Sequence, residues 1–163
     1  MRIYVASSWR NDRQPAVVDT LRAAGHEVYD FRHPEPGNDG FHWSEIDPSW
    51  QGWDGAQFAS ALAHPIAEAG YGRDRAGLDW CDTCVLVLPS GRSAHLEAGY
   101  AVGQGKPTVI LLDDQQEPEL MYKLATTLVH SIDDLLACLG RLGGRGPTRS
   151  SSPPAPGRKR LRR

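Results

Sequence analysis

The stretch from Cys84 to Lys106 (CVLVLPSGRSAHLEAGYAVGQGK) constrains the fold of this 163-residue chain more than any other. It opens with an uninterrupted apolar run, Val85–Leu88, which is typical of a strand buried on both faces of a parallel sheet. A Pro-Ser-Gly turn ends the run. The small and apolar residues that follow favour a helix packed on the sheet, with Ser93 as its N-cap. Open α/β sheets place their ligands at such a strand, turn and helix.

The rest of the chain alternates strands and helices in the same way. Further strands are expected over Arg2–Ser7, His26–Phe31, Pro107–Leu112 and Thr127–His130. Further helices are expected from Asn11 or Asp12 to Ala24, over Asp54–Ala69 with a kink or division at Pro65, over Tyr71–Trp80, over Pro118–Ala125, and after a Ser131 cap. This order predicts an α/β fold: one doubly wound, mostly parallel five-stranded sheet in the order 2-1-3-4-5, with helices on both faces.

That strand order brings two loops together. Strands 1 and 3 become neighbours whose crossovers leave on opposite faces, so the loops Ser7–Asn11 and Pro89–His95 flank one crevice at the carboxyl ends of the strands. The ligand site is therefore expected in this crevice.

Charge divides the chain into two parts. Residues 141–163 hold eight of the 18 basic residues and none of the 20 acidic ones, which leaves the first 140 residues with a net charge of −10. We expect an α/β domain over 1–142 and a disordered basic tail rich in Pro, Ser and Arg over 143–163. The acidic body argues against nucleic-acid binding, except through the tail.

Several classes of protein and site are disfavoured by the sequence. Apolar runs are too short for a membrane helix or a signal peptide, so a cytoplasmic protein is expected. Cys81, Cys84 and Cys138 are best interpreted as buried thiols, and the six histidines show no metal-ligand spacing, so no metal or cofactor is expected. Dinucleotide and P-loop signatures are absent from the sequence.

The segment Arg32–Trp53 breaks the alternation. It is rich in Pro, Gly and Asp and contains Phe41, His42, Trp43, Trp50 and Trp53, and this aromatic content argues against disorder. Two interpretations stay open: a lid or pocket wall, or rings that cover the end of the core.

The residues that could carry chemistry converge on the crevice. Glu97 lies early in the expected helix, and Asp74 lies in the helix before the third strand. The turn Gly91-Arg92-Ser93 at a helix N-terminus suits an anionic group such as a monophosphate. The first loop adds Ser7, Ser8, Trp9 and Arg10 as candidate substrate-binding residues.

These motifs resemble those of a known family. An aspartate in a short helix (YGRDRAGLDWCD), a strand beginning at Asp82, and a turn into HLEAGYA followed by GKP are similar to the nucleoside 2-deoxyribosyltransferase superfamily, which includes 2'-deoxynucleoside 5'-monophosphate N-hydrolases. The resemblance is firmest over Tyr71–Leu112 and absent from the aromatic segment and the tail. It implies that Glu97 is the nucleophile at the anomeric carbon, that Asp74 acts near the base or sugar, and that the protein is a homo-oligomer such as a dimer.

Physical chemistry supports these implied roles. An N-glycosidic bond breaks through an oxocarbenium-like state, which a carboxylate can stabilise or trap, and a second acid can protonate or position the departing base. The first loop and the basic turn around Arg92 depart from the family pattern. Together with Arg10, this turn favours 5'-phosphorylated substrates. Two further hypotheses stay open: a nucleotide-sensing module without turnover on the same scaffold, and an interaction protein that acts through its tail.

Overall fold

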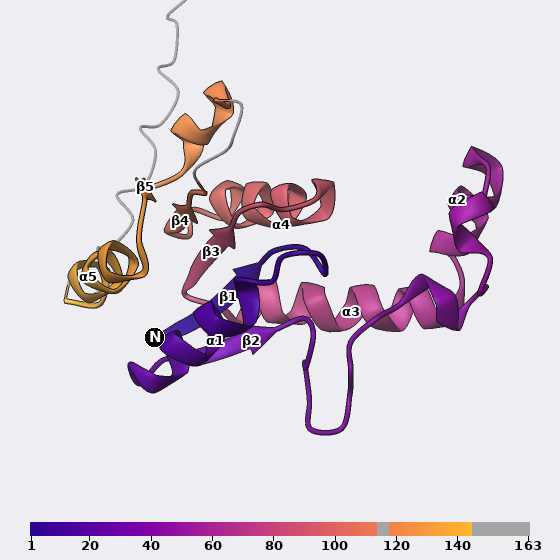
Figure 1. Ribbon diagram of the computed structural model, residues 1–163, viewed down its shortest axis with the longest axis horizontal. Coiled ribbons are helices and arrows are strands. Elements are labelled where there is room, and N and C mark those ends of the chain that lie inside the picture. The colour runs from indigo at the N-terminus through magenta and orange to yellow at the C-terminus, as the bar shows by residue number, and fades with distance from the viewer. Residues whose placement is uncertain (114–117, 145–163) are drawn as a thin grey trace, which may run out of the picture.

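A single parallel sheet organises the computed structural model, which describes residues 1–113 and 118–144 (Figure 1). Its strands lie in the order β2-β1-β3-β4-β5, and all four pairings are parallel. The strands are β1 (Arg2–Ala6), β2 (Glu27–Asp30), β3 (Thr83–Val87), β4 (Thr108–Leu111) and β5 (Thr127–Val129). The predicted fold class and strand order are confirmed.

Helices cover both faces of the sheet. The helices are α1 (Gln14–Ala23), α2 (Gly55–Leu62), α3 (Pro65–Trp80), α4 (Arg92–Gly103) and α5 (Ile132–Gly143), with 3₁₀ turns at Trp43–Glu45, Trp50–Gly52 and Leu120–Leu124. One core layer joins the sheet to α1 and α5, and the other joins it to α3 and α4. Successive residues of β1 and β3 alternate between the two layers, as the pleat of a strand requires.

The loops after β1 and β3 lie side by side, as predicted. β1 pairs with β3 up to Ala6 and Leu86. Beyond this pair, the buried Ser7 hydroxyl donates to the Val87 carbonyl oxygen at 2.9 Å, and the Asn11 amide donates to the same oxygen at 3.1 Å. The two loops expected to flank the crevice are therefore neighbours at the carboxyl ends of the strands.

The structure corrects two predicted helices. The expected helix over Asp54–Ala69 ends at Leu62, and the next helix runs without interruption from Pro65 to Trp80. The predicted division at Pro65 is confirmed, since Pro65 occupies the first turn of α3, where a proline costs no hydrogen bond. The separate helix start at Tyr71 is wrong. The N-cap of α4 is Gly91 rather than Ser93, because the helix begins directly after the turn.

The helices α3 and α4 are tied together near their C-terminal ends. The Lys106 ammonium donates to the carbonyl oxygens of Leu78 and Asp79, which are among the free acceptors at the end of α3. The Tyr100 hydroxyl of α4 donates to the Asp79 carboxylate at 2.6 Å, and Arg75 stacks over the Tyr100 ring. These contacts fix α3 against α4 on the side away from the loops of the crevice.

The C-terminal part of the described chain ends with α5, which Ser131 caps as predicted by accepting a hydrogen bond from the Asp134 backbone amide.

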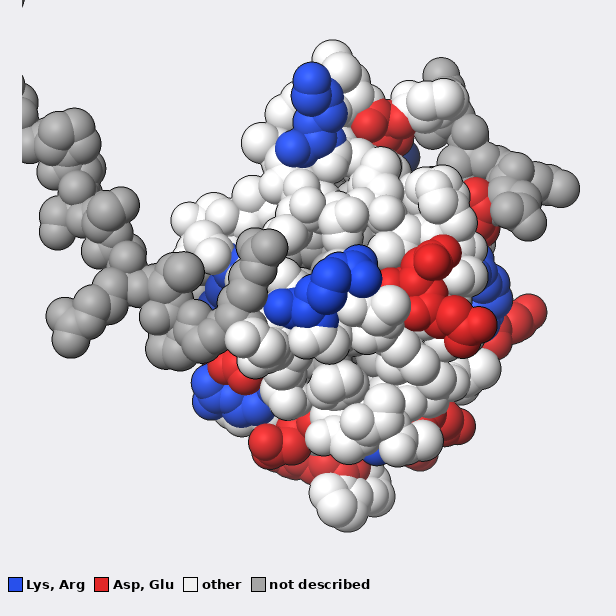
Figure 2. Space-filling view, turned by 90° about the vertical axis from the view of Figure 1, so that its left-hand side faces the viewer, with Lys and Arg blue, Asp and Glu red and all other residues white. Residues whose placement is uncertain are grey.

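The face turned to the viewer in Figure 2 carries acidic side chains in several groups with basic ones between them, so it is not the continuous basic surface of a nucleic-acid binder. The expected disordered tail falls outside the described residues from position 145 onward. None of the described helices combines the length and apolar character needed to cross a membrane.

Candidate functional site

Two carboxylates from different helices lie within electrostatic reach of each other. Glu97 lies in the second turn of α4 and Asp74 lies in the middle of α3. Both side chains are partly buried. The charge on Asp74 raises the pKa of Glu97, so the two carboxyl groups lie close enough to interact. The predicted catalytic pair is thus brought together.

A stacked pair of tyrosines lies behind the two carboxylates. Tyr4 of β1 and Tyr29 of β2 are direct partners in the sheet, and their rings stack with centroids 5.1 Å apart and planes 10° apart. The Tyr29 hydroxyl donates to Asp74 Oδ1 at 2.9 Å. The Tyr4 side chain is fully buried, and its hydroxyl finds no hydrogen-bond partner within residues 1–113 and 118–144.

Burial sets the protonation of the site. The pKa of Glu97 rises to about 7, first because the carboxyl is buried and second because of the charge on Asp74, while the nearby Tyr4 hydroxyl opposes the rise. Burial also raises the pKa of Asp74, opposed by the hydrogen bond from Tyr29 and by the charge of Arg73. A partly buried carboxyl that titrates near neutrality beside a second carboxyl is typical of a catalytic group.

The first loop is held from beneath by polar groups. Ser7 is occupied structurally, since its hydroxyl donates to Val87 and accepts from the Asn11 amide. Ser8 accepts from the Arg10 backbone amide through its hydroxyl. Arg32 donates to the carbonyl oxygens of Ser8, Trp9 and Asn11 at 3.0–3.1 Å. The sequence pattern does not indicate the supporting role of Arg32 or the contact of Asn11 with Val87, because these partners are backbone atoms distant in the chain.

Trp9 offers a ring at the surface of this loop. The side chain is 40% exposed, and it contacts Phe31 edge-on and His42 at a tilt, with the Arg32 guanidinium 5.4 Å from its ring centroid. The Arg10 side chain is also exposed. Of the four predicted substrate-binding residues in the first loop, Trp9 and Arg10 therefore expose their side chains to solvent, whereas Ser7 is buried.

The aromatic segment between β2 and α3 is folded and extends beyond the sheet (Figure 1). Trp43 packs edge-on against Phe41, Trp53 and Phe58. Phe41 rests on α3 at Gly70, where an added Cβ would lie 3.0 Å from the ring. Phe41, Trp43, Trp53 and Phe58 belong to neither core layer. Phe41 contacts the first half of α3, and the neighbouring His42 contacts Trp9. This placement argues against a cover for the end of the core, and the pocket-wall interpretation stays a prediction.

The predicted anion site is the N-terminus of α4. Gly91, Arg92 and Ser93 are all exposed, and no side chain caps the first amides of this twelve-residue helix. Backbone amides at such a terminus attract an anion. His95 fixes the turn, with Nδ1 2.9 Å from the Gly91 carbonyl oxygen and Nε2 2.9 Å from the Tyr122 hydroxyl.

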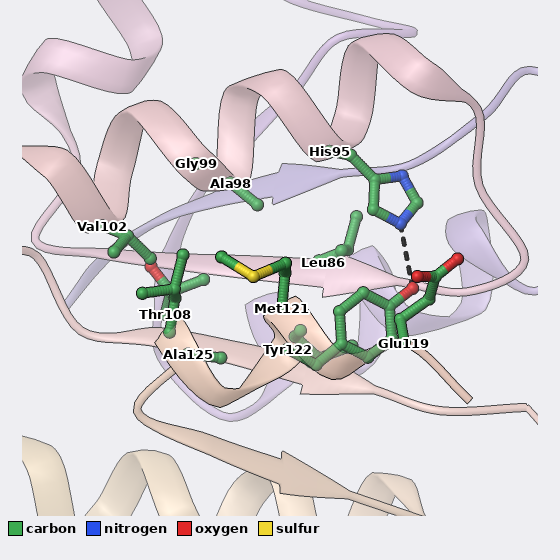
Figure 3. Close-up of a pocket in the computed structure, with 12 residues that line it drawn as sticks. Leu86, His95, Ala98, Gly99, Val102, Thr108, Glu119, Met121, Tyr122 and Ala125 are labelled. Atoms are coloured by element: carbon green, nitrogen blue, oxygen red, sulfur yellow. Dashed lines mark hydrogen bonds between the residues drawn. The ribbon is translucent and has the colours of Figure 1, made fainter.

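A cavity of about 280 Å³ lies on the other flank of α4, between this helix and the turn at Leu120–Leu124 (Figure 3). The hydrogen-bonded His95 and Tyr122 lie at one end, and Val102, Met121 and Ala125 lie toward the other. Glu97 and Asp74 do not line this cavity. It is therefore separate from the carboxylate pair.

The described residues offer no obvious metal site. Among them, no three His, Cys, Asp or Glu side chains gather as metal ligands. Cys81, Cys84 and Cys138 are buried free thiols, as expected. Asp82, which the sequence places before β3, accepts hydrogen bonds from the Arg2 guanidinium and backbone amide and thus joins the starts of β1 and β3.

Comparison with known proteins gives similarity of structure but not of sequence. No protein-family model matches the chain, and no curated protein matches it in sequence. A solved 2-deoxyribosyltransferase from Bacillus psychrosaccharolyticus superposes with a TM-score of 0.54 at 17% identity, over 83% of this chain and 90% of that one. The chain shares the fold of a 2-deoxyribosyltransferase.

Two further solved structures are similar. A conserved protein from Enterococcus faecalis V583 superposes with a TM-score of 0.55 at 18% identity, over 86% of this chain and 97% of that one. A CMP N-glycosidase from Clostridium botulinum superposes less closely, with a TM-score of 0.45 at 14% identity over 86% and 99% of the two chains. The match to the solved 2-deoxyribosyltransferase confirms, at the level of the fold, the resemblance that the motifs indicate.

Proposed function

We propose that the protein is an enzyme that cleaves the N-glycosidic bond of 2'-deoxynucleosides or their 5'-monophosphates, by hydrolysis or by transfer to another base. The observation that carries this proposal is the pair of partly buried carboxylates, Glu97 and Asp74, at the switch point of a deoxyribosyltransferase fold. Open α/β sheets bind their ligands at this point, and two carboxylates suit chemistry at an anomeric carbon.

Glu97 acts as the nucleophile in this proposal. Its carboxylate oxygen forms a bond to C1' while the C1'–N bond breaks and its electron pair passes to the base nitrogen. Asp74 lies across the crevice, where it orients the base or sugar or carries a proton to the departing base. Water, or the nitrogen of a second base, then attacks C1' and releases the Glu97 carboxylate.

The electrostatics of the site predict the pH dependence of this step. Glu97 must be ionised to attack, and its pKa is raised to about 7 by burial and by Asp74. Activity governed by this ionisation should therefore increase as the pH rises toward 7 and level off above it.

A 5'-phosphate fits the N-terminal end of α4. The exposed amides after Gly91 and the side chains of Arg92 and Ser93 lie two turns or less from Glu97 on the same helix. Arg10 is exposed on the neighbouring loop after β1. Together they supply hydrogen-bond donors and positive charge for a phosphate dianion.

A homodimer is the second part of the proposal. The outer side of α4 and the turn after β4 expose several large apolar side chains, with Leu96 76%, Leu120 75%, Met121 64% and Leu124 59% exposed. Several exposed apolar side chains of this size, three of them in the single turn Leu120–Leu124, are typical of a protein interface. The superfamily resemblance favours a second copy of this chain as the occupant.

The test is release of free base from dAMP, dGMP, dCMP and dTMP and from the matching deoxynucleosides, followed by chromatography between pH 5 and 9. Glu97→Ala should lower release at least about a thousandfold, because it removes the nucleophile. Glu68→Ala, which removes an exposed carboxylate of α3, is the matched control and should retain activity. Nucleotide binding without release would favour a sensing module instead. Equal turnover of a deoxynucleoside and its monophosphate would contradict the phosphate site.

A further inference from the structure

Tyr29 connects the edge of the sheet to the helix that carries Asp74. Its hydroxyl is 2.9 Å from Asp74 Oδ1, and within the described part of the chain it is the one side chain that donates a hydrogen bond to that carboxylate. Its ring lies flat on the ring of Tyr4, which occupies the facing position on β1. The Asp74 carboxylate is therefore linked to the sheet by the Tyr29 hydroxyl, and the Tyr29 ring is in turn held by its stack on Tyr4.

Gly77 makes room for that ring. A Cβ added at this buried glycine would lie 2.8 Å from two ring atoms of Tyr29, closer than real Cβ contacts allow. Glycine in a helix interior costs about 1 kcal/mol relative to alanine, so its presence has to be compensated by a packing advantage. Gly77 follows Asp74 by about one helical turn and therefore lies on the same face of α3.

We propose that Tyr29 is a positioning residue of the active site, whose hydroxyl fixes the Asp74 carboxylate opposite Glu97 and whose ring is seated against the bare backbone of Gly77. The inference rests on the proposed function for its catalytic meaning. Its geometric content, a carboxylate held by a tyrosine, can be measured without turnover.

The hydrogen bond also decides where the negative charge of the pair resides. Asp74 is faced by Tyr29 from β2 and by Glu97 from α4, with Arg73 beside it on α3, and Tyr4 of β1 faces Glu97. Donation from Tyr29 stabilises the Asp74 carboxylate and lowers its pKa against the effect of burial. The Asp74 charge in turn raises the pKa of Glu97. Loss of the donor should move the proton from Glu97 toward Asp74.

Tyr29→Phe tests this directly, because it keeps the ring and removes the hydroxyl. The carboxyl carbons of Asp74 and Glu97 can be followed by NMR as the pH is varied. In the variant, Asp74 should titrate at a higher pH than in the wild type, and Glu97 should begin to titrate at a lower pH. With the best substrate, kcat/KM should fall about tenfold or more, with the shape of its pH profile changed.

Two glycine variants form a matched pair. Gly77→Ala should lower kcat/KM and shift the Asp74 titration, because the added Cβ displaces the Tyr29 ring. Gly72→Ala adds the same group to the same helix, where nothing lies within 4 Å, and should change neither quantity. Tyr29→Phe with wild-type titration of both carboxyls would overturn the positioning role. A wild-type protein that releases no base, with the titration shifts present, would overturn the proposed function and leave the positioning of Asp74 supported.

Discussion

Replacement of Glu97 by glutamine should stabilise the fold above neutral pH. The pKa of this carboxyl is raised from 4.5 to about 7 in the folded protein, first by burial and then by the charge of Asp74. At a given pH between these values, the unfolded chain has released the proton and the folded chain still holds it. Stability is therefore lost as the pH rises from about 4.5 to about 7 and stays low above that range.

The size of the effect follows from the shift. Each unit of pKa difference corresponds to about 1.4 kcal/mol, so an ionised Glu97 costs on the order of 3 kcal/mol at high pH. Glutamine keeps the shape and carries no charge, and so it should escape most of this cost. The variant should melt at about the wild-type temperature near pH 4.5 and at a temperature about 6–12 °C higher near pH 8.5.

Thermal unfolding followed by circular dichroism at both pH values measures this difference, and denaturant titration gives the free energy of unfolding independently. Asp82→Asn is a suitable control. The hydrogen bond and charge of Arg2 lower the pKa of Asp82, so its contribution to stability is lost on acidification, the opposite direction. An equal stability change between pH 4.5 and pH 8.5 in wild type and Glu97→Gln would refute the argument that burial raises the pKa of Glu97.

Two further predictions concern the loop and the interface. Asn11→Ala should lower the free energy of unfolding by about 2–3 kcal/mol, because the buried side-chain amide makes hydrogen bonds with Ser7, Val87 and the Arg13 backbone amide. Thermal melting measures this loss, and a loss under about 0.5 kcal/mol would contradict the prediction. Leu96→Arg should convert the proposed dimer to a monomer by placing a charge on the exposed apolar face of α4, as light scattering can show, whereas a wild-type protein that is already monomeric would refute the dimer.

Much of the fold could be predicted because its central strands are recognisable as short, continuous apolar runs in the sequence. Val85–Leu88 and Val109–Leu112 are apolar throughout, which is the pattern of parallel strands covered on both faces, and their alternation with helices leaves few topologies. Helix boundaries were less certain. Pro65 is compatible with either a kink or a start, and local sequence does not show which one the surrounding packing selects.

The sequence indicates the two candidate carboxylates, and their catalytic role stays a prediction, but it does not indicate the side chains that support them. A motif indicates Glu97 and Asp74. Tyr29 contacts Asp74, which is 45 positions away in the chain, and Arg32 contacts the first loop, which is 21 to 24 positions away. Ser7 shows the converse limit. Its place at the end of β1 favours a ligand contact, but its hydroxyl donates a hydrogen bond to the neighbouring Val87 carbonyl oxygen instead. Such choices depend on tertiary neighbours that a linear pattern does not contain.

Because α3 and α4 are joined near their C-terminal ends, a small rotation of α3 about that joint would change the separation of Asp74 and Glu97. Asp74 lies five residues before Asp79, a lever of about 7.5 Å at the rise of an α-helix. Rotation of α3 by about 8° at this joint would move Asp74 by about 1 Å relative to Glu97. A displacement of that size can cost about a hundredfold in rate. Substitution of Tyr100 or Lys106, which are partly buried at this joint, should therefore change turnover without altering any group that touches substrate.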